Sequence, residues 1–259
     1  MILAGIDAGS RAIKIVLIDK DRNIIAQGSH DQGIHQEEIT NQLLNMLLEE
    51  KGYSRKDLAK ITATGYGRDL ISFADKTISE ITCHAKGVHH LVPNVRTVID
   101  IGGQDSKLIK LDANGSIEDF IMNDRCAAGT GCFLEVVANR LGVNLETLAK
   151  MASQSSNPAV ISSMCVVFAE TEIIGLLASG TEPKDIVAGV QKSIASRIKS
   201  MAGRNINTPI IFTGGVAMIP SMVNALESVL AKPIAIAPQP QFTGALGAAI
   251  LAAELSKNF

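Results

Sequence analysis

The chain has 259 residues, of which 46% are hydrophobic and 19% charged, and a formal net charge of −2 at pH 7. That length allows one large domain or two lobes of ordinary size. The near-neutral charge argues against nucleic-acid or anionic-membrane binding, and a chain without Trp offers few base-stacking surfaces. No basic segment precedes the first strand, and the Ala-rich stretch 245–255 is too short to span a bilayer, so a cytoplasmic protein is expected.

The apolar pattern, taken in chain order, predicts two halves that each combine strands with helices. In the first half we expect a strand–turn–strand over 4–19, strands over 23–29 and 61–64, and helices over 36–51 and 78–91. In the second half we expect strands over 97–111, 117–122, 160–164, 210–213 and 234–236, and helices over 133–141, 145–152, 168–178, 185–203, 221–230 and 242–255.

A segment of the first half recurs 93 positions later. Each copy has an apolar strand, an acidic residue, a glycine-containing turn and a second strand that begins near a lysine. The matched residues are Asp7, Gly9, Lys14, Val16 and Asp19 in one copy and Asp100, Gly102, Lys107, Ile109 and Asp112 in the other. A duplicated hairpin predicts two related lobes. Small turn residues let N–H groups approach an anion and a carboxylate can hold a hydrated cation, so the turns indicate a nucleotide-phosphate clamp.

Three motifs in this order resemble those of actin, sugar kinases and the heat-shock-chaperone ATPases. Residues 7–11 (D-A-G-S-R) resemble the first phosphate motif of that superfamily, 100–104 (D-I-G-G-Q) the second, and 212–216 (F-T-G-G-V) the adenosine motif. The resemblance implies an α/β fold of two similar actin-like (ribonuclease H-like) lobes with a nucleotide cleft between them. Lobe I is expected at 1–94, completed by a C-terminal helix at 242–259, and lobe II at 95–241.

The clamp residues divide by their chemistry. Asp7 and Asp100 are expected to hold Mg²⁺, mostly through water, because Mg²⁺ dehydrates reluctantly. Gln104 completes the expected catalytic set by orienting an attacking water, with simple turn hydrogen bonding as an equal alternative. Lys14 is either a phosphate ligand or a solvated strand lysine. The expected nucleotide-binding residues are Gly9, Ser10, Arg11, Ala12, Ile13, Lys14, Gly102, Gly103, Gln104, Gly214, Gly215, Val216 and Gln241.

Two of the four cysteines stand just before predicted helices. Cys126 lies in N-D-R-C-A-A-G-T-G and Cys165 in I-S-S-M-C-V-V-F-A-E, whereas Cys83 is expected to be a buried small residue. Amides at a helix N-terminus stabilise a thiolate and also an anionic cluster bound to it. An iron–sulfur cluster needs four thiolates, which the two subunits of a twofold dimer can supply together.

Both cysteine motifs, with A-T-G-Y-G-R-D, V-I-D-I-G-G-Q-D-S-K and F-T-G-G-V-A, resemble the ATP-dependent activators of 2-hydroxyacyl-CoA dehydratases and the ATPase subunits of benzoyl-CoA reductases. The resemblance spans about residues 5–252 and implies a homodimer with one 4Fe–4S cluster, ligated by Cys126 and Cys165 of both subunits, beside ATP/ADP and Mg²⁺. It implies that ATP drives one low-potential electron from a ferredoxin or flavodoxin into a partner iron–sulfur enzyme. The expected acceptor is a 2-hydroxyacyl-CoA dehydratase, with a double-cubane iron–sulfur protein or benzoyl-CoA reductase core as alternative.

Residue 132 departs from that family, which usually has Arg at this position. At helical spacing Cys132 is nearly two turns from Cys126, so we expect an inert replacement rather than a spare ligand or a redox-sensitive site. Glu170 and Glu172 are expected in the first turn of the helix after Cys165.

Several weaker interpretations stay open. The pair Cys83-His84 with His89-His90 fits no compact zinc pattern, so packing is expected there. Residues 64–68 form a hinge, a docking loop or a plain tight turn. A small-molecule kinase or an actin- or chaperone-like ATPase is a more remote function, because neither explains both motif cysteines.

Overall fold

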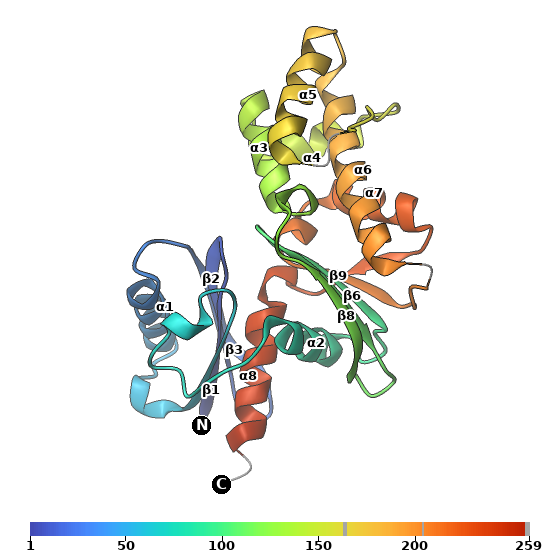
Figure 1. Ribbon diagram of the computed structural model, residues 1–259. Helices are drawn as coiled ribbons and strands as arrows, with labels where there is room; N and C mark the ends of the chain where they lie inside the picture. Colours follow the sequence, from blue (N-terminus) through green and yellow to red (C-terminus); the bar gives the residue numbers. More distant parts are fainter. Residues whose placement is uncertain (163–164, 204, 257–259) are drawn as a thin grey trace. The chain divides into compact units, whose positions relative to one another are not determined.

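The computed structural model describes residues 1–162, 165–203 and 205–256 (Figure 1). The chain forms two compact units. Unit 1 comprises Met1–Val95, Leu111–Glu118 and Ala237–Phe259, and unit 2 comprises Arg96–Lys110 and Asp119–Ile236. Among the described residues, no helix has the length and apolar character needed to cross a membrane.

Unit 1 is built on a five-stranded sheet with helices on both faces. Its strands are β1 (Ile2–Ala8), β2 (Ala12–Ile18), β3 (Ile24–Asp31), β4 (Leu58–Thr64) and β5 (Lys76–Thr77). Its helices are α1 (Gln36–Glu50), α2 (Glu80–Leu91) and α8 (Thr243–Ser256), with short 3-10 turns at Arg55–Asp57, Arg68–Leu70 and Pro240–Phe242.

The sheet of unit 2 also has five strands and is covered by longer helices. Its strands are β6 (Thr97–Ile101), β7 (Ser106–Leu111), β8 (Ile117–Asn123), β9 (Ile210–Thr213) and β10 (Ile234–Ile236). Its helices are α3 (Gly131–Leu141), α4 (Leu145–Ser153), α5 (Val166–Ala178), α6 (Pro183–Ala202) and α7 (Pro220–Leu230), with 3-10 turns at Ala127–Gly129 and Gly215–Met218.

The two sheets have the same topology. The strand order is β3-β2-β1-β4-β5 in unit 1 and, in the same sense, β8-β7-β6-β9-β10 in unit 2. In each sheet the first strand pairs antiparallel with the second and parallel with the fourth, β4 or β9. The repeat seen in the sequence is therefore a repeat of the whole sheet, which confirms the predicted fold class.

Strand β1 is buried on both faces, and each face has its own partner. Ile6 and its alternate neighbours pack with α1, whereas Leu3 packs with α8 on the opposite face, as the period of two in a strand requires. Helix α8 is apolar around its whole circumference and almost fully buried, the pattern of a core helix. A side chain at Gly5 would overlap the backbone of Ala245, so glycine allows the helix to lie directly on the strand.

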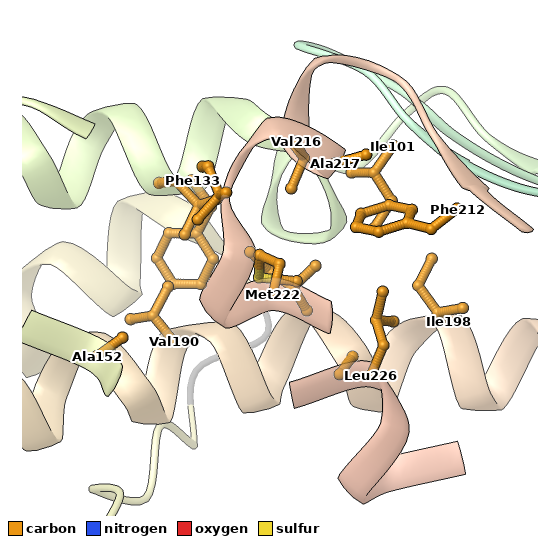
Figure 2. Close-up of a cluster of buried hydrophobic side chains, with 14 of the residues drawn as sticks. Ile101, Phe133, Ala152, Val190, Ile198, Phe212, Val216, Ala217, Met222 and Leu226 are labelled. Carbon is orange, nitrogen blue, oxygen red and sulfur yellow. The ribbon is translucent and has the colours of Figure 1, made fainter. Parts of the chain in front are cut away.

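The core of unit 2 joins five helices, α3 to α7, to the sheet, and Figure 2 shows part of it. Phe133 from α3 and Phe212 from β9 are both fully buried in it, beside Val190 from α6 and Met222 from α7. Each of these aromatic side chains contributes roughly 2–3 kcal/mol of burial free energy. The core therefore fixes the start of α3 against the strands that end at Ile101 and Thr213.

Three local predictions were wrong. Residues 160–162 form no strand, because Ala159 donates its N–H to Asp185 at the start of α6 and Ser162 bonds to Glu172 instead of to a neighbouring strand; positions 163–164 lie outside the described residues. Helix α3 begins at residue 131, so Cys126 precedes a 3-10 turn and the helical spacing assumed to Cys132 does not apply. Helix α5 begins at residue 166, which puts Glu170 and Glu172 beyond its first turn.

Candidate functional site

The turn after β1 in unit 1 places a nearly buried carboxylate beside an ammonium group. Asp7 is 6% exposed and lies opposite Lys14 in the β1–β2 register, with Lys14 Nζ 3.4 Å from Asp7 Oδ2. Gly9 N–H donates to Ala12 O at 3.1 Å and closes the turn. A Cβ at Gly9 would lie 2.9 Å from the backbone oxygen of Ala12, so the tight turn favours glycine at this position.

Unit 2 repeats this arrangement at the atomic level. Asp100 lies opposite Lys107, and Lys107 Nζ is 3.2 Å from Asp100 Oδ2. Gly102 N–H donates to Asp105 O at 2.9 Å, the same bond 93 positions further along. The two predicted phosphate turns are therefore equivalent in their backbone hydrogen bonding as well as in their residues.

A glycine with positive φ borders the carboxylate in each unit, and these two glycines were not predicted from the sequence as a repeated pair. Gly65, after β4, has φ +95°, and Gly214, after β9, has φ +90°. A Cβ at Gly65 would lie 2.7 Å from Asp7 Oδ1, and one at Gly214 would lie 2.6 Å from Asp100 Oδ1. Only glycine combines that φ with that approach. The signal was present in the sequence as Thr-Gly after the parallel strand of each half, at 64–65 and 213–214.

The two lysines differ in ways that the repeat conceals. Lys107 also contacts Asp105 Oδ2 at 2.7 Å, and its side chain is 2% exposed. The position equivalent to Asp105 in unit 1 is Ala12, and Lys14, whose side chain is 19% exposed, pairs with Asp7. Lys107 is therefore held between two carboxylates inside the fold, whereas Lys14 is partly open to solvent.

The remaining turn residues are accessible. Ser10 and Gly103 are half-buried, and Arg11 and Gln104 are exposed at the tips of their turns. Exposure of Gln104 is compatible both with positioning water and with simple turn hydrogen bonding.

The predicted nucleoside-binding residues lie in both units. Gly215 begins the 3-10 turn after β9, has open space where a Cβ would stand, and precedes the buried Val216. Gln241 is half-buried in the 3-10 turn before α8 and belongs to unit 1.

The turn of unit 2 is hydrogen-bonded directly to the start of α3. Gly131 N–H donates to Gly102 O at 2.9 Å, and Cys132 N–H donates to Gly103 O at 2.8 Å. A Cβ at Gly131 would lie 3.0 Å from Gly102 O, a tight contact that favours glycine there. Two consecutive amides at the start of α3 are thus tied to the turn.

The loop that carries Cys126 is held by one side chain that sequence reasoning missed. Asn123, at the end of β8, donates from Nδ2 to Cys126 O at 2.9 Å and accepts from Cys126 N–H at Oδ1 at 3.1 Å. Thr130 Oγ1 donates to Ala127 O at 2.8 Å across the following 3-10 turn. This short chain of contacts connects the half-buried Cys126 to the first residue before α3.

Cys165 occupies the N-cap position of α5 and is exposed. Arg140 of α3 forms an ion pair with Glu170 of α5, so the helices that follow the two cysteines are joined by charge as well as packing (Figure 1). Within the described part of the chain, no group of three or more His, Cys, Asp or Glu is placed to hold a metal by itself.

The other two cysteines occupy different environments. Cys83 is fully buried in α2, and burial raises the pKa of its thiol to about 12, as expected for a packing residue. The Cys132 side chain is half-buried in the first turn of α3. His84, which follows Cys83 in α2, is also buried, and its Nδ1 lies 3.1 Å from Thr243 Oγ1 of α8.

Two sheets of identical topology, each with the same acidic residue, lysine and glycine-bounded turn, define the actin-like class of ATPase. A family profile narrows this class. The profile of the BadF/BadG/BcrA/BcrD ATPase family matches residues 4–252, and the chain belongs to that family.

Individual relatives match the chain over most of its length. It is 45% identical over 264 residues to the activator of lactoyl-CoA dehydratase from Anaerotignum propionicum, covering 100% of both chains. It is 32% identical over 262 residues to one of the subunits of benzoyl-CoA reductase from Thauera aromatica, covering 96% of this chain and 92% of that protein. The solved structure of the activator of the 2-hydroxyisocaproyl-CoA dehydratase from Clostridium difficile with bound ADPNP has TM-score 0.93 and 41% identity, covering 100% of this chain and 96% of that one. The resemblance found in the sequence is confirmed.

Proposed function

We propose that this ATPase is the electron-transferring activator of a 2-hydroxyacyl-CoA dehydratase. The single observation that carries the proposal is the pair of hydrogen bonds from Gly131 and Cys132 to the carbonyls of the phosphate turn. They connect a nucleotide-binding element to the loop of Cys126. The similarity to the activators of lactoyl-CoA dehydratase and of 2-hydroxyisocaproyl-CoA dehydratase supports the same acceptor class.

The residues around both carboxylates fit a magnesium nucleotide. Asp7 and Asp100 are nearly buried, and glycines border each of them where a larger side chain would collide. Carboxylate oxygens are the ligands that Mg²⁺ prefers, directly or through water. The phosphates would be held by Lys14 and by the amides of the Gly9 turn and of the Gly102–Gly103 turn. The nucleoside would be held by the Gly214–Val216 segment and Gln241.

The cysteines fit a shared 4Fe–4S cluster. Cys165 is the N-cap of α5, whose first amides favour an anionic ligand, and Cys126 stands before the 3-10 turn at Ala127–Gly129. Two thiols from each of two subunits complete the four that such a cluster needs. A cluster bound there would supply one low-potential electron, so the functional unit that we propose is a homodimer.

The chain's own residues couple the two sites within unit 2. ATP binds one position of the Gly102–Gly103 turn better than another and thereby shifts its population. The start of α3 follows through its two amide bonds, and Asn123 keeps Cys126 in register with that movement. Hydrolysis, for which Gln104 orients the water, restores the first position.

The finer assignments follow from the proposed activity. The proposed electron donor is a ferredoxin or flavodoxin, and the proposed compartment is the cytoplasm. The proposed lobe I comprises residues 1–94 and 242–259, and the proposed lobe II comprises residues 95–241. A benzoyl-CoA reductase core is the second candidate acceptor, favoured by the 32% identity to one component of that enzyme. A double-cubane iron–sulfur protein is a variant of the same electron-accepting role.

Anaerobic purification followed by iron counting tests this function. We expect a brown dimer with about four irons that reduces a purified 2-hydroxyacyl-CoA dehydratase only in the presence of ATP and a low-potential donor. The Cys126→Ser variant should retain nucleotide binding and lose electron transfer. A colourless monomer that still hydrolyses ATP contradicts the proposal, and reduction of benzoyl-CoA reductase alone would select the second acceptor.

A further inference from the structure

Helix α5, whose N-cap is Cys165, is held to the core of unit 2 by few side chains. Two of its thirteen residues, Ala169 and Ile173, are buried, against nine of the twenty residues of α6. Val167 and Phe168, in its first turn, are 69% and 70% exposed. A helix that buries so little apolar surface is displaced at a lower cost in free energy than a core helix. The polar contacts of α5 therefore contribute a large share of what fixes its position.

One of these polar contacts joins α5 to α3 beside a cavity. Arg140, in the last turn of α3, forms an ion pair with Glu170 of α5. The two side chains line an open cavity of about 330 Å³ together with Val136 and Asn139 of α3. Van der Waals attraction is lost where atoms have no neighbours on one side. At this place the connection between the two helices is therefore electrostatic.

The opposite end of α3 is bonded to the phosphate turn of unit 2. Gly131 N–H and Cys132 N–H donate to the carbonyl oxygens of Gly102 and Gly103. Arg140 lies further along the same helix, about 13 Å from the first residue at a rise of 1.5 Å per residue. Helix α3 therefore joins the phosphate turn at its first residues to α5 at its last turn.

A second carboxylate of α5 holds the segment that precedes Cys165. Glu172 Oε1 accepts from Ser162 N–H at 2.8 Å and from Ser162 Oγ at 2.7 Å. Because Glu170 and Glu172 are two positions apart in a helix, they point about 200° apart around its axis. One carboxylate thus faces α3 and the other faces the chain that leads into Cys165. Cys165 is tied to α5 both as its N-cap and through the segment of Ser162.

We propose that Arg140 is a positioning residue for Cys165: through its ion pair with Glu170 it makes α5 follow α3, so that a nucleotide at the Gly102–Gly103 turn sets the position of Cys165. The inference rests on the proposed function and extends its coupling from Cys126 to the second cluster cysteine. A cluster ligated by both thiols is strained when one of them shifts alone. The ion pair lets the two cysteines of one subunit shift together.

Amide hydrogen exchange of the oxidised holoprotein, with MgADP and with a non-hydrolysable MgATP analogue, reads the position of α5 directly. The side chains of Arg140 and Glu170 are 41% and 38% exposed, so their pair supports an effect of only a few fold. We expect the exchange rates of α5 amides to differ roughly threefold between the two nucleotides in the unaltered protein. In Arg140→Glu the ratio should fall to about one, and the double variant Arg140→Glu with Glu170→Arg should restore it.

The outcomes distinguish the inference from the proposed function. An unchanged ratio in Arg140→Glu, or a double variant that restores nothing, overturns the inference. So does an unaltered protein in which α3 responds to the nucleotide and α5 does not. If neither helix responds to a nucleotide that calorimetry shows to be bound, the coupling in the proposed function fails instead.

Iron release to a chelator gives a second readout, at the cysteines themselves. We expect the rates with MgADP and with the MgATP analogue to differ roughly threefold in the unaltered protein and to become nearly equal in Arg140→Gln. Arg22→Gln is the matched control, because Arg22 pairs with Glu254 of unit 1 at 3.3 Å and is similarly exposed. It should leave the ratio of the two rates unchanged. A ratio that stays the same in Arg140→Gln, or that falls equally in Arg22→Gln, overturns the inference.

Discussion

The two lysines of the repeated hairpins show how one residue type takes opposite roles in one molecule. Lys107 is enclosed with Asp100 and Asp105 and is almost fully buried, whereas Lys14 pairs with Asp7 and is partly open. Coulombic attraction is stronger where water is excluded, but so is the cost of an unpaired charge. A buried lysine between two carboxylates is therefore structural, and an accessible one can serve a ligand.

Substitution of each lysine by methionine separates those roles. We expect Lys107→Met to lower the free energy of unfolding by about 3 kcal/mol or more, because two carboxylates lose their shared cation. Lys14→Met should cost less, about 1–2 kcal/mol, because the pair of Lys14 with Asp7 is partly open to solvent, and should weaken ATP binding by roughly tenfold. Denaturant unfolding and calorimetry check the pair. Equal destabilisation by both, or unaltered ATP affinity of the Lys14 variant, contradicts the assignment.

At the scale of elements, glycine determines how closely α8 can pack in unit 1. A side chain at Gly247 would overlap the carbonyl group of Cys83 in α2, and one at Gly87 would overlap Thr243 of α8. Each helix thus presents a glycine where the other crosses it, and Figure 1 shows the two lying against each other. Contact at backbone distance transmits small shifts, because no flexible side chain stands between the helices.

Alanine substitutions in two helices test this packing. Gly247→Ala should lower the free energy of unfolding by about 2 kcal/mol, since the methyl group forces α8 away from α2. Gly175→Ala in α5 is the matched control, because open space surrounds that position. It should raise helix stability by roughly 0.5–1 kcal/mol. If thermal and denaturant unfolding gave changes in the free energy of unfolding of the same sign for both variants, the contact between α2 and α8 would not be tight.

The elements also show what could be predicted from sequence and what could not. Periodicity located the helices of the described chain to within a few residues, since it reports directly which face is buried. It failed at 160–162, where Ile161 packs against the core of unit 2 without a strand partner. It could not find Asn123, whose role depends on atoms brought together by tertiary structure. The Asp-x-Gly motifs at 7–9 and 100–102 and the two cysteine motifs could be recognised because each is a run of neighbouring residues in the sequence.

For the molecule as a whole, the proposed function assigns nucleotide binding to the duplicated hairpins and electron transfer to the segment in which the two copies differ. Unit 1 has α1 between β3 and β4, whereas unit 2 has α3 to α6 between the corresponding strands β8 and β9. Both motif cysteines lie in that longer segment of unit 2. An ATPase of this class acquires its specific function from such an insertion, since the fold alone hosts many activities. The coupling between turn and insertion is accordingly the property to test.

Asn123 provides that test, because its side chain is hydrogen-bonded to the backbone of Cys126 and it lies outside the predicted nucleotide-binding set. In Asn123→Ala both bonds are lost; in Asn123→Asp the carboxylate still accepts from Cys126 N–H but cannot donate to its carbonyl. We expect ATP hydrolysis within about twofold of the unaltered protein in both, and electrons delivered per ATP reduced by roughly tenfold in the Ala variant and less in the Asp variant. Iron content, measured on the same samples, distinguishes uncoupling from loss of the cluster. An unchanged ratio of electrons to ATP in the Ala variant, with full iron content, would mean that nucleotide state reaches Cys126 by another route.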